Sequence, residues 1–494
     1  MVRTTTARLV IGSIVVIAAS AYAQKASVEG SGKPRVDLKP DKISCRGKEY
    51  DGLRGTLYVP EDRTRPDSRM IDLPVVVVKS LSPNPDYPIF QFTGGPGISN
   101  IAPEEHVSEA SLKDHDVVEV GYRGIDGPVK LTHPHFNEIF RTPNILSPSS
   151  LKQIGQKLTQ AAKDLTAAGM DVEEYNILNV VDDMEAARAS LGYEKINITG
   201  GSYGGAVVMV YCLRYPERIN RAIMLEAAFP YDIAFGKPEE FDTRLNHLNE
   251  LWKKNAESVK RSTDIVQTMR NVLARMPEEY NGMPIELSKV RFMTYFGITN
   301  QRSYANMVLD AYVSAEKGDF SSIAAMCLMY DQFMRFAIYP GDLLAKTFSS
   351  VTDRDRDFVA ELSDPGSVIG SPLSMVAWGS FQYSNWPVKP VAKEHPPTQK
   401  SNVETLIFYG SKETGKPFRK KYEGNFTNAH WLILDDLGHM DIWNIIGEGT
   451  NHLMLRFLND GVVDTSKIGR IPEWDFTPQA TFQQILQQMM QQVK

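Results

Sequence analysis

Residues 200–205 read Gly200-Gly201-Ser202-Tyr203-Gly204-Gly205, and this stretch decides the fold. The apolar, strand-like run 195–199 precedes it, and the helix-like run 206–215 follows it. A strand, a glycine-rich turn with a central serine, and a helix form the layout of a nucleophile elbow. Glycines suit such a turn because it is tight and side chains would clash with it. The pattern predicts that the turn lifts the Ser202 hydroxyl above a sheet edge.

Short apolar runs recur on both sides of this turn. Many are rich in β-branched or aromatic residues, and Gly, Asp or Pro bound them, which favours buried strands of a parallel sheet. The runs are 89–92, 117–120, 196–199, 222–225, 406–409 and 431–434. Helical spacing over 180–191 separates two of them, and extended stretches at 53–59 and 74–79 predict hairpins upstream. This alternation predicts an α/β fold with a mostly parallel, doubly wound sheet.

The alternation stops near Pro230, and residues 239–353 are mainly helical in pattern. We expect a large helical insertion that forms a lid over the site, since insertions at strand ends shape such sites. At the carboxyl end, Phe482, Ile485, Leu486, Met489 and Met490 repeat with helical spacing among glutamines. This amphipathic helix is expected to dock on the body of the protein.

A serine hydroxyl needs a base and an orienting acid to act as a nucleophile. His439 is the best candidate base, because a Gly-His loop after the last predicted strand places an imidazole at the sheet edge. Glu413 is the preferred acid because it follows the strand 406–409 through Gly410. Glu226, at the end of the strand 222–225, is the alternative acid; it could instead hold a loop through backbone N–H groups.

An oxyanion hole is predicted from two backbone N–H groups. Thr93-Gly94-Gly95-Pro96-Gly97 follows the strand 89–92, and a glycine-rich turn there can aim N–H groups at the serine. Gly95 N–H and Tyr203 N–H are the expected donors.

With these motifs in order, the chain resembles the α/β-hydrolase superfamily. It is most similar to the branch of proline iminopeptidases and secreted tripeptidyl-aminopeptidase-like hydrolases. The family motif G-G-S-Y-G-G matches residues 200–205 at every position, and the family's final Gly-His matches Gly438-His439. The family's G-x-x-D-P has the same offset as Gly410 to Glu413. The resemblance covers roughly residues 45–230 and 403–440, and it implies an acyl-transferring serine hydrolase with a helical cap.

Two departures from the family lie beside the oxyanion loop. Thr93 replaces the family histidine of H-G-G-P-G, and Gly121-Tyr122 replaces Asp-Gln of D-Q-R-G-x-G. These changes weaken the inference of an aminopeptidase more than that of a hydrolase. The resemblance to aminopeptidases also implies cap carboxylates that bind a substrate ammonium. The sequence does not choose among the candidates, which include Glu239, Glu240, Asp242, Glu316 and Asp319.

The amino terminus is predicted to be a secretory signal peptide. Arg3 and Arg8 precede the apolar run 9–19 and give a positively charged start. Ala21-Tyr22-Ala23 has the form of a cleavage site. We therefore expect a secreted or periplasmic protein, cut after Ala23, with no stable membrane insertion after cleavage; an uncleaved anchor is the alternative. The three cysteines, Cys45, Cys212 and Cys327, allow at most one internal disulfide.

The expected organisation follows from these boundaries. It comprises a signal peptide (1–23), a flexible leader (24–44), a first core part (45–235), a helical cap (236–400), a second core part (401–475) and a terminal amphipathic helix (476–494).

The sequence predicts a secreted serine hydrolase that uses Ser202, Glu413 and His439. Small peptides cleaved near a free amino terminus are the first substrate class, and small esters or amides the alternative. A non-catalytic binding protein or a lyase on the same scaffold remains possible. No metal or organic cofactor is expected. The net charge of −6 argues against a nucleic-acid partner, and the sequence leaves the oligomeric state open.

Overall fold

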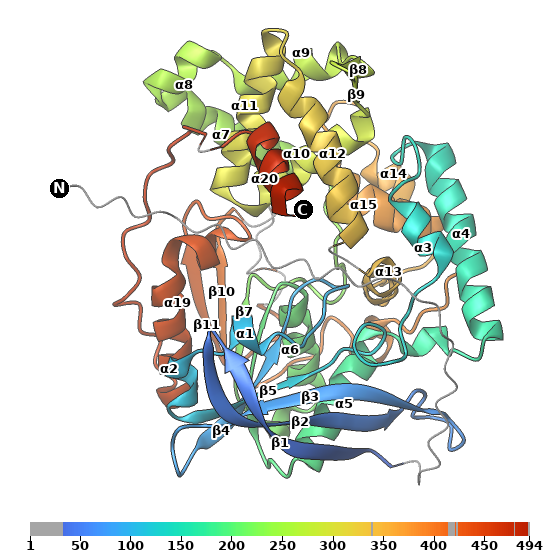
Figure 1. Ribbon diagram of the computed structural model, residues 1–494, viewed down its shortest axis with the longest axis vertical. Coiled ribbons are helices and arrows are strands. Elements are labelled where there is room, and N and C mark those ends of the chain that lie inside the picture. Colours follow the sequence, from blue (N-terminus) through green and yellow to red (C-terminus); the bar gives the residue numbers. More distant parts are fainter. Residues whose placement is uncertain (1–32, 337–338, 413–419, 421–422, 479, 493–494) are drawn as a thin grey trace.

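The structure is a computed structural model, and it describes residues 33–336, 339–412, 420, 423–478 and 480–492. A nine-stranded sheet lies in the lower half of Figure 1, and a group of helices stands above it. The predicted signal peptide, residues 1–23, lies outside the described residues. Within the described residues, no helix has the length and apolar character to span a membrane.

The sheet has the strand order β1-β2-β3-β5-β4-β6-β7-β10-β11. Strands β1, β2, β3 and β5 pair antiparallel in that order, and β5, β4, β6, β7, β10 and β11 pair parallel. The strands are β1 (Arg35–Cys45), β2 (Lys48–Pro60), β3 (Met70–Val78), β4 (Asp86–Phe92), β5 (His115–Val120), β6 (Ile196–Gly201), β7 (Ile219–Leu225), β10 (Glu404–Gly410) and β11 (Ala429–Leu434). The predicted fold class, a mostly parallel doubly wound sheet, is confirmed.

Alternating side chains of the strands face two separate hydrophobic layers. Phe90 and Ile407 pack with α5 (Ile177–Ser190) and α6 (Tyr203–Arg214) on one face. Their neighbours Ile89 and Leu406 pack with α19 (Asp441–Asp460) on the other face. This division follows from the two-residue period of a strand. Both faces are covered, so the central strands are buried, as the continuous apolar runs predicted.

Further helices come before the insertion. They are α1 (Pro103–His106), α2 (Glu109–Leu112), α3 (Pro134–Ile139), η1 (Val172–Glu174) and η2 (Pro216–Arg218), together with the longer α4 (Pro148–Ala167). Of these, α3 and α4 pack with helices of the insertion rather than around the sheet (Figure 1).

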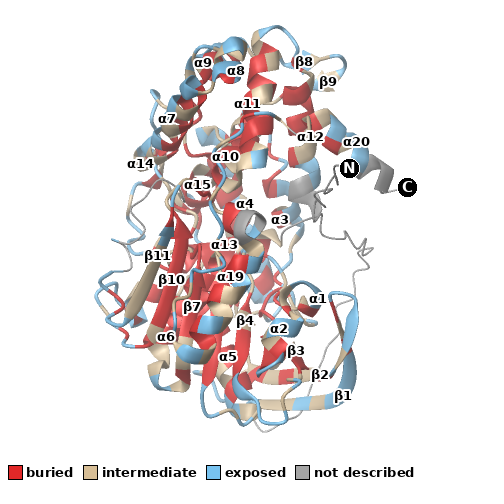
Figure 2. Cartoon of the chain, turned by 90° about the vertical axis from the view of Figure 1, so that its left-hand side faces the viewer, coloured by how far each residue is buried: buried red, intermediate tan, exposed pale blue. Residues whose placement is uncertain are grey.

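The insertion between β7 and β10 is mainly helical, as the sequence predicted, and it forms a cap above the sheet (Figure 1). Its elements are α7 (Pro238–Lys254), α8 (Ala256–Arg261), α9 (Ile265–Ala274), β8 (Glu279–Tyr280), β9 (Met283–Pro284), α10 (Leu287–Asn300), α11 (Arg302–Glu316), α12 (Ser321–Phe336), α13 (Pro340–Phe348), α14 (Phe358–Leu362), α15 (Pro372–Ser374), the π-helical η3 (Met375–Gly379), α16 (Ser380–Gln382) and α17 (Val391–Glu394). The cap has its own hydrophobic core, seen as buried helix faces in Figure 2.

The chain returns to the cap after the last core helix. Arg302 Nη1 donates to the Pro472 carbonyl (2.6 Å), and Asn306 Nδ2 donates to the Asp475 carbonyl (2.6 Å). The amphipathic terminal helix, α20 (Phe482–Gln492), then packs against α12, where Phe482 and Ile485 are buried in the cap core. The expected docking of this helix on the body is therefore observed.

One boundary was wrong. The sequence predicted a flexible leader over residues 24–44, but residues 35–44 belong to β1, which pairs with β2 along its whole length. The sequence shows no strand pattern here because β1 is an edge strand with many polar and charged side chains. Only Ile43 and Cys45 are buried in it. The three cysteines are all unbridged and buried.

Candidate active site

Ser202 lies in a sharp turn between β6 and α6. Its backbone has φ 54° and ψ −123°, a left-handed conformation that a residue with a side chain rarely adopts. Three hydrogen bonds hold the turn: Ser202 N–H donates to the Leu225 carbonyl (3.0 Å), while the Ser202 carbonyl accepts from the N–H groups of Gly205 (3.0 Å) and Ala228 (2.8 Å). The strand, turn and helix of a nucleophile elbow are thus present.

The glycines that follow the serine are needed because α6 lies very close to its neighbours. A Cβ atom at Gly204 would lie 2.2 Å from the Phe92 carbonyl oxygen. A Cβ atom at Gly205 would lie 2.3 Å from the Cβ atom of Ala227. Side chains at these two positions would push the helix away from β4 and β7 and displace the serine.

The glycine-rich loop after β4, which we call the oxyanion loop (residues 93–98), lies beside the serine. A Cβ atom at Gly94 would sit 3.2 Å from the Ser202 Cβ atom and 3.7 Å from its Oγ atom. Gly95 has φ +115°, and it lines the same cavity as Ser202. Tyr203 is the first residue of α6, so its N–H has no acceptor within the helix. Both predicted donors therefore belong to backbone segments that adjoin Ser202.

The oxyanion loop is anchored by Asn100, Tyr122 and Asp126, of which the sequence pointed only to Tyr122. Asn100 Oδ1 accepts from Thr93 N–H (2.7 Å), and Asn100 Nδ2 donates to the Gln91 carbonyl (3.1 Å) and the Val120 carbonyl (2.8 Å). Tyr122, one of the departures from the family pattern, donates its hydroxyl to the Thr93 carbonyl (3.1 Å). Asp126 accepts from the N–H groups of Asn100 and Tyr122. The family pattern placed Tyr122 beside the loop, whereas nothing in the sequence pointed to Asn100 or Asp126.

His439 lies in the loop after β11, which we call the histidine loop (residues 435–440). Met440 N–H donates to the Asn300 carbonyl (2.7 Å) at the end of α10, and Arg302 Nη2 donates to the Asp436 carbonyl (3.0 Å). The histidine loop is therefore docked on the cap.

The histidine loop also contacts the start of α19. Gly438 N–H donates to Asp441 Oδ2 (2.8 Å), and Arg302 N–H donates to Asp441 Oδ1 (2.9 Å). Burial raises the pKa of the Asp441 carboxyl, while these two N–H groups lower it.

Trp443 links the histidine loop to the serine turn. Its ring lies 6.2 Å from the His439 ring, centroid to centroid. A Cβ atom at Gly201 would lie 2.8 Å from the Trp443 Cζ2 atom. His439 and Ser202 line the same cavity. The structure thus brings together two residues that are far apart in the sequence.

Glu413, the preferred acid, lies outside the described residues, and its role stays a prediction. The residues just before it lie against the histidine loop. Lys412 N–H donates to the Leu437 carbonyl (3.1 Å), and a Cβ atom at Gly410 would lie 2.2 Å from that same oxygen.

Glu226, the alternative acid, is fully buried at the end of β7 and has φ 46°. Its Oε1 atom accepts from Gly410 N–H (2.7 Å), and its own N–H donates to the Phe408 carbonyl (3.0 Å). This is the loop-holding contact that the sequence analysis considered as the alternative to catalysis. Glu226 also lines the cavity, so its assignment as an acid stays open to test.

A cavity of about 1050 Å³ lies between the sheet edge and the cap. Its cap wall is largely aromatic and includes Phe235, Phe241, Phe292, Tyr295 and Phe296. Charged side chains also line the cavity, and those next to this wall include Asp232, Lys237, Glu240 and Arg244. A space of this size and lining suits an organic substrate with a bulky apolar part.

Only one of the five cap carboxylates named from the sequence, Glu240, lines this cavity. Asp242 accepts from Val368 N–H (3.1 Å), Glu316 pairs with Arg275 (3.2 Å), and Asp319 accepts from Ser321 N–H (3.0 Å). Glu239 is exposed. Asp232 was missed because it precedes the helical part of the insertion.

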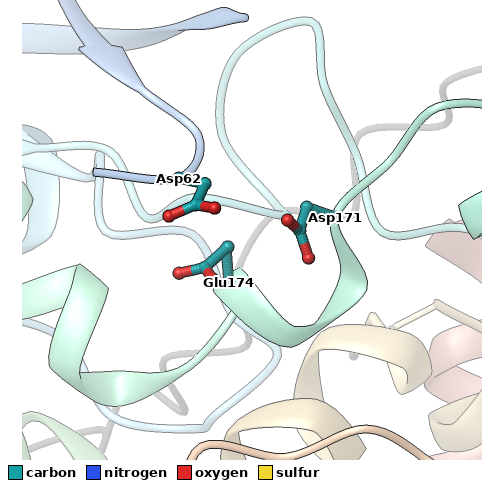
Figure 3. Close-up of side chains that lie close together, drawn as sticks. All are labelled: Asp62, Asp171 and Glu174. Carbon is teal, nitrogen blue, oxygen red and sulfur yellow. The ribbon is translucent and has the colours of Figure 1, made fainter. Parts of the chain in front are cut away.

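Asp62, Asp171 and Glu174 form the one cluster of three possible metal ligands in the part of the chain that the structure describes (Figure 3). Each of the three carboxylates already has a partner. Lys389 Nζ contacts Glu174 Oε1, and Asn179 Nδ2 donates to Glu174 Oε2 (2.6 Å). Thr64 donates to Asp62 Oδ1 through its N–H and its hydroxyl, and Arg65 lies 3.8 Å from Asp171. Lys389 and Arg65 therefore already place positive charge beside this cluster.

Comparison with known proteins identifies the class of fold. A family model described as the alpha/beta hydrolase fold matches residues 150–304, which include the serine turn. Together with the sheet order and the helical insertion, this match defines an α/β-hydrolase fold. No curated protein sequence matches the chain.

Solved structures resemble the chain at low identity. The epoxide hydrolase CorEH has 13% identity and a TM-score of 0.36, over 85% of this chain and 99% of that one. A thermophilic esterase from Thermogutta terrifontis has 12% identity and a TM-score of 0.35, over 82% and 98%. A proline iminopeptidase from Mycobacterium smegmatis has 13% identity and a TM-score of 0.34, over 82% and 97%.

Proposed function

We propose that the protein is an exported serine hydrolase that cleaves acyl bonds through Ser202. One observation carries the proposal: Ser202 sits in a strained turn at the start of α6, against Gly94 of the oxyanion loop, in a cavity that it shares with His439. Strained backbone of this kind clusters at active sites, where the surrounding structure holds it. Export rests on the predicted signal peptide alone.

In the proposed reaction, Ser202 Oγ attacks the carbonyl carbon of the substrate while His439 takes the hydroxyl proton. Gly95 N–H and Tyr203 N–H donate to the oxyanion, and each such donor is worth about 2.7–4 kcal/mol in the transition state. His439 then gives the proton to the leaving group, and the acyl-enzyme forms. Water, activated by His439, attacks this ester and releases the acid. Glu413 orients the imidazole and stabilises its charged form.

Small peptides with a free amino terminus are the first substrate class that we propose. Glu240 and Asp232 line the cavity on the cap side and supply negative charge for a substrate ammonium. Small esters or amides are the second class, because the aromatic cap wall suits an apolar acyl group without any ammonium.

The central test compares wild-type protein with the Ser202→Ala variant on panels of aminoacyl amides and esters. We expect the variant to lose turnover and to resist labelling by a fluorophosphonate probe. Undiminished turnover in the variant would refute the mechanism, and a wild-type protein that never labels would favour a binding protein.

The substrate class can be tested with one matched pair of compounds. An aminoacyl p-nitroanilide and its N-acetylated form differ only in the ammonium group. A peptidase of the proposed type prefers the free amine, and Glu240→Gln reduces this preference, whereas Glu239→Gln, at the exposed neighbouring position, leaves it unchanged. An equal rate for both compounds would favour the esterase or amidase alternative.

A further inference from the structure

Helix α13 lies between the cap and the core (Figure 1) and has two functional faces. Leu343 and Thr347 on one face line the cavity. Asp342 and Lys346 on another face are both fully buried, with exposed side-chain fractions of 0%. Two charged side chains buried this deeply are uncommon, because burial removes their hydration.

The buried pair lies directly behind the oxyanion loop and the serine turn. Lys346 Nζ sits 4.8 Å above the centre of the Tyr122 ring and 5.8 Å from that of Tyr203. Tyr122 binds the Thr93 carbonyl, and Tyr203 is the proposed second oxyanion donor. Tyr339, just before α13, donates its N–H to the Gly97 carbonyl (2.8 Å). The same short segment therefore contacts both sides of the oxyanion hole.

The two charged groups have few hydrogen-bond partners for a pair that serves stability alone. Lys346 Nζ and Asp342 Oδ1 are 2.7 Å apart and form an ion pair. Apart from this pair and the Gly97 N–H that faces Asp342, no group among the described residues hydrogen-bonds Lys346 Nζ, the Asp342 carboxylate or the Tyr203 hydroxyl. A buried ion pair without such bonds costs more free energy than apolar residues of similar size.

The charge state of Asp342 reflects this cost. Burial raises the pKa of its carboxyl to about 6, although Lys346 opposes the rise. Asp126 adds a smaller upward effect, and Gly97 N–H, which faces the carboxylate, a smaller downward one. Tyr122 and Tyr203 are the other titratable groups beside the pair, and burial holds both pKa values well above the usual range.

We propose that Asp342 and Lys346 are positioning residues for the oxyanion hole, holding Gly97 from one end and the Tyr122 and Tyr203 rings from the other. This proposal rests on the proposed function, since the hole matters only if Ser202 performs acyl transfer. The pair does not touch the substrate. It fixes the backbone whose N–H groups do, and a small displacement of such groups lowers kcat rather than substrate affinity.

The test removes both charges together, because a single substitution would leave an unpaired buried charge and unfold the protein. The double variant Asp342→Asn/Lys346→Met keeps similar volumes. The matched control is Lys289→Met/Asp331→Asn in the cap, where Lys289 Nζ lies 2.8 Å from Asp331 Oδ1 and 5.8 Å from the Tyr330 ring centre. Three quantities are measured: the melting temperature, kcat and KM on p-nitrophenyl acetate, and amide hydrogen exchange of residues 91–100.

We expect the double variant to melt at or above the wild-type temperature, with kcat reduced about 10- to 100-fold and KM unchanged. Residues 94–98 should exchange faster in this variant and not in the control. Unchanged kcat with unchanged exchange would overturn the proposal. A wild-type protein that neither labels with a fluorophosphonate nor hydrolyses the ester would refute the proposed function instead, and the exchange measurement would still decide whether the pair holds the loop.

Discussion

The two loops that flank Ser202 are anchored in different ways. The oxyanion loop is tied to the sheet by the buried Asn100 and Tyr122, and to α13 through Gly97. The histidine loop is tied to the cap, through the end of α10 and through Arg302. The oxyanion loop is therefore held by the core together with one cap helix, α13, whereas the histidine loop is held by α10 and Arg302 of the cap together with α19 of the core. A change in α10 or α11 should reach His439 before it reaches Ser202.

The largest expected effect comes from removing the proposed base. His439→Ala should lower kcat by about 10⁴-fold or more, because the serine loses its general base. Steady-state ester hydrolysis measures the loss, with His430→Ala, a histidine of β11 outside the cavity, as the control. Near-normal turnover in His439→Ala would show that His439 is not the general base.

The next largest effect is a pH dependence at Asp342 of α13, which lies behind the oxyanion loop. Its pKa is raised from 3.8 to about 6 in the folded protein. The folded state thus holds the proton more tightly than the unfolded state, so this group's contribution to stability is greatest below pH 4. It is lost as pH rises to 6, by up to about 3 kcal/mol.

Thermal unfolding at several pH values checks this sign. The Asp342→Asn/Lys346→Met variant should gain stability relative to wild type between pH 4 and pH 7. A difference that is flat with pH would show that Asp342 titrates normally.

A smaller effect is expected from loosening the oxyanion loop within the core. Asn100→Ala removes the acceptor for Thr93 N–H and should lower kcat by about 10²-fold with little change in KM. The variant should also lose about 1–3 kcal/mol of unfolding free energy, because buried backbone groups lose their partners. Kinetics and denaturant unfolding measure the two effects, and Asn84→Ala, in an exposed turn, is the control.

The smallest expected effect comes from loosening the cap side. Arg302→Met removes the bonds to the Asp436 and Pro472 carbonyls. It should lower kcat by about 10-fold, since the histidine loop keeps its other contacts. Arg275→Met, which removes another cap arginine that binds backbone carbonyls, is the matched control. If Arg302→Met alters fluorophosphonate labelling no more than the control does, the histidine loop does not depend on the cap.

The sequence predicted the sheet, the helical insertion and the serine turn because each leaves a local pattern. Buried parallel strands are short apolar runs, and the glycines around Ser202 reflect the close packing of α6 against β4 and β7. The support of the oxyanion loop left no such pattern. Asn100 meets Asp126, and Lys346 meets Tyr122, only after the chain has folded. An edge strand such as β1 has too little buried surface to show an apolar pattern in the sequence.

The segment after α19, residues 461–478, binds the cap and so restricts how the cap can move. The cap is joined to the core not only where it leaves β7 and enters β10 but also through residues 461–478, which run from α19 to Arg302 and Asn306. A hinge motion of the whole cap away from the sheet would have to move residues 461–478 with it or break their bonds to Arg302 and Asn306. Substrate entry and product release should therefore depend on local shifts of single helices or side chains around the cavity. A disulfide that joins residues 461–478 to the cap would leave turnover unchanged.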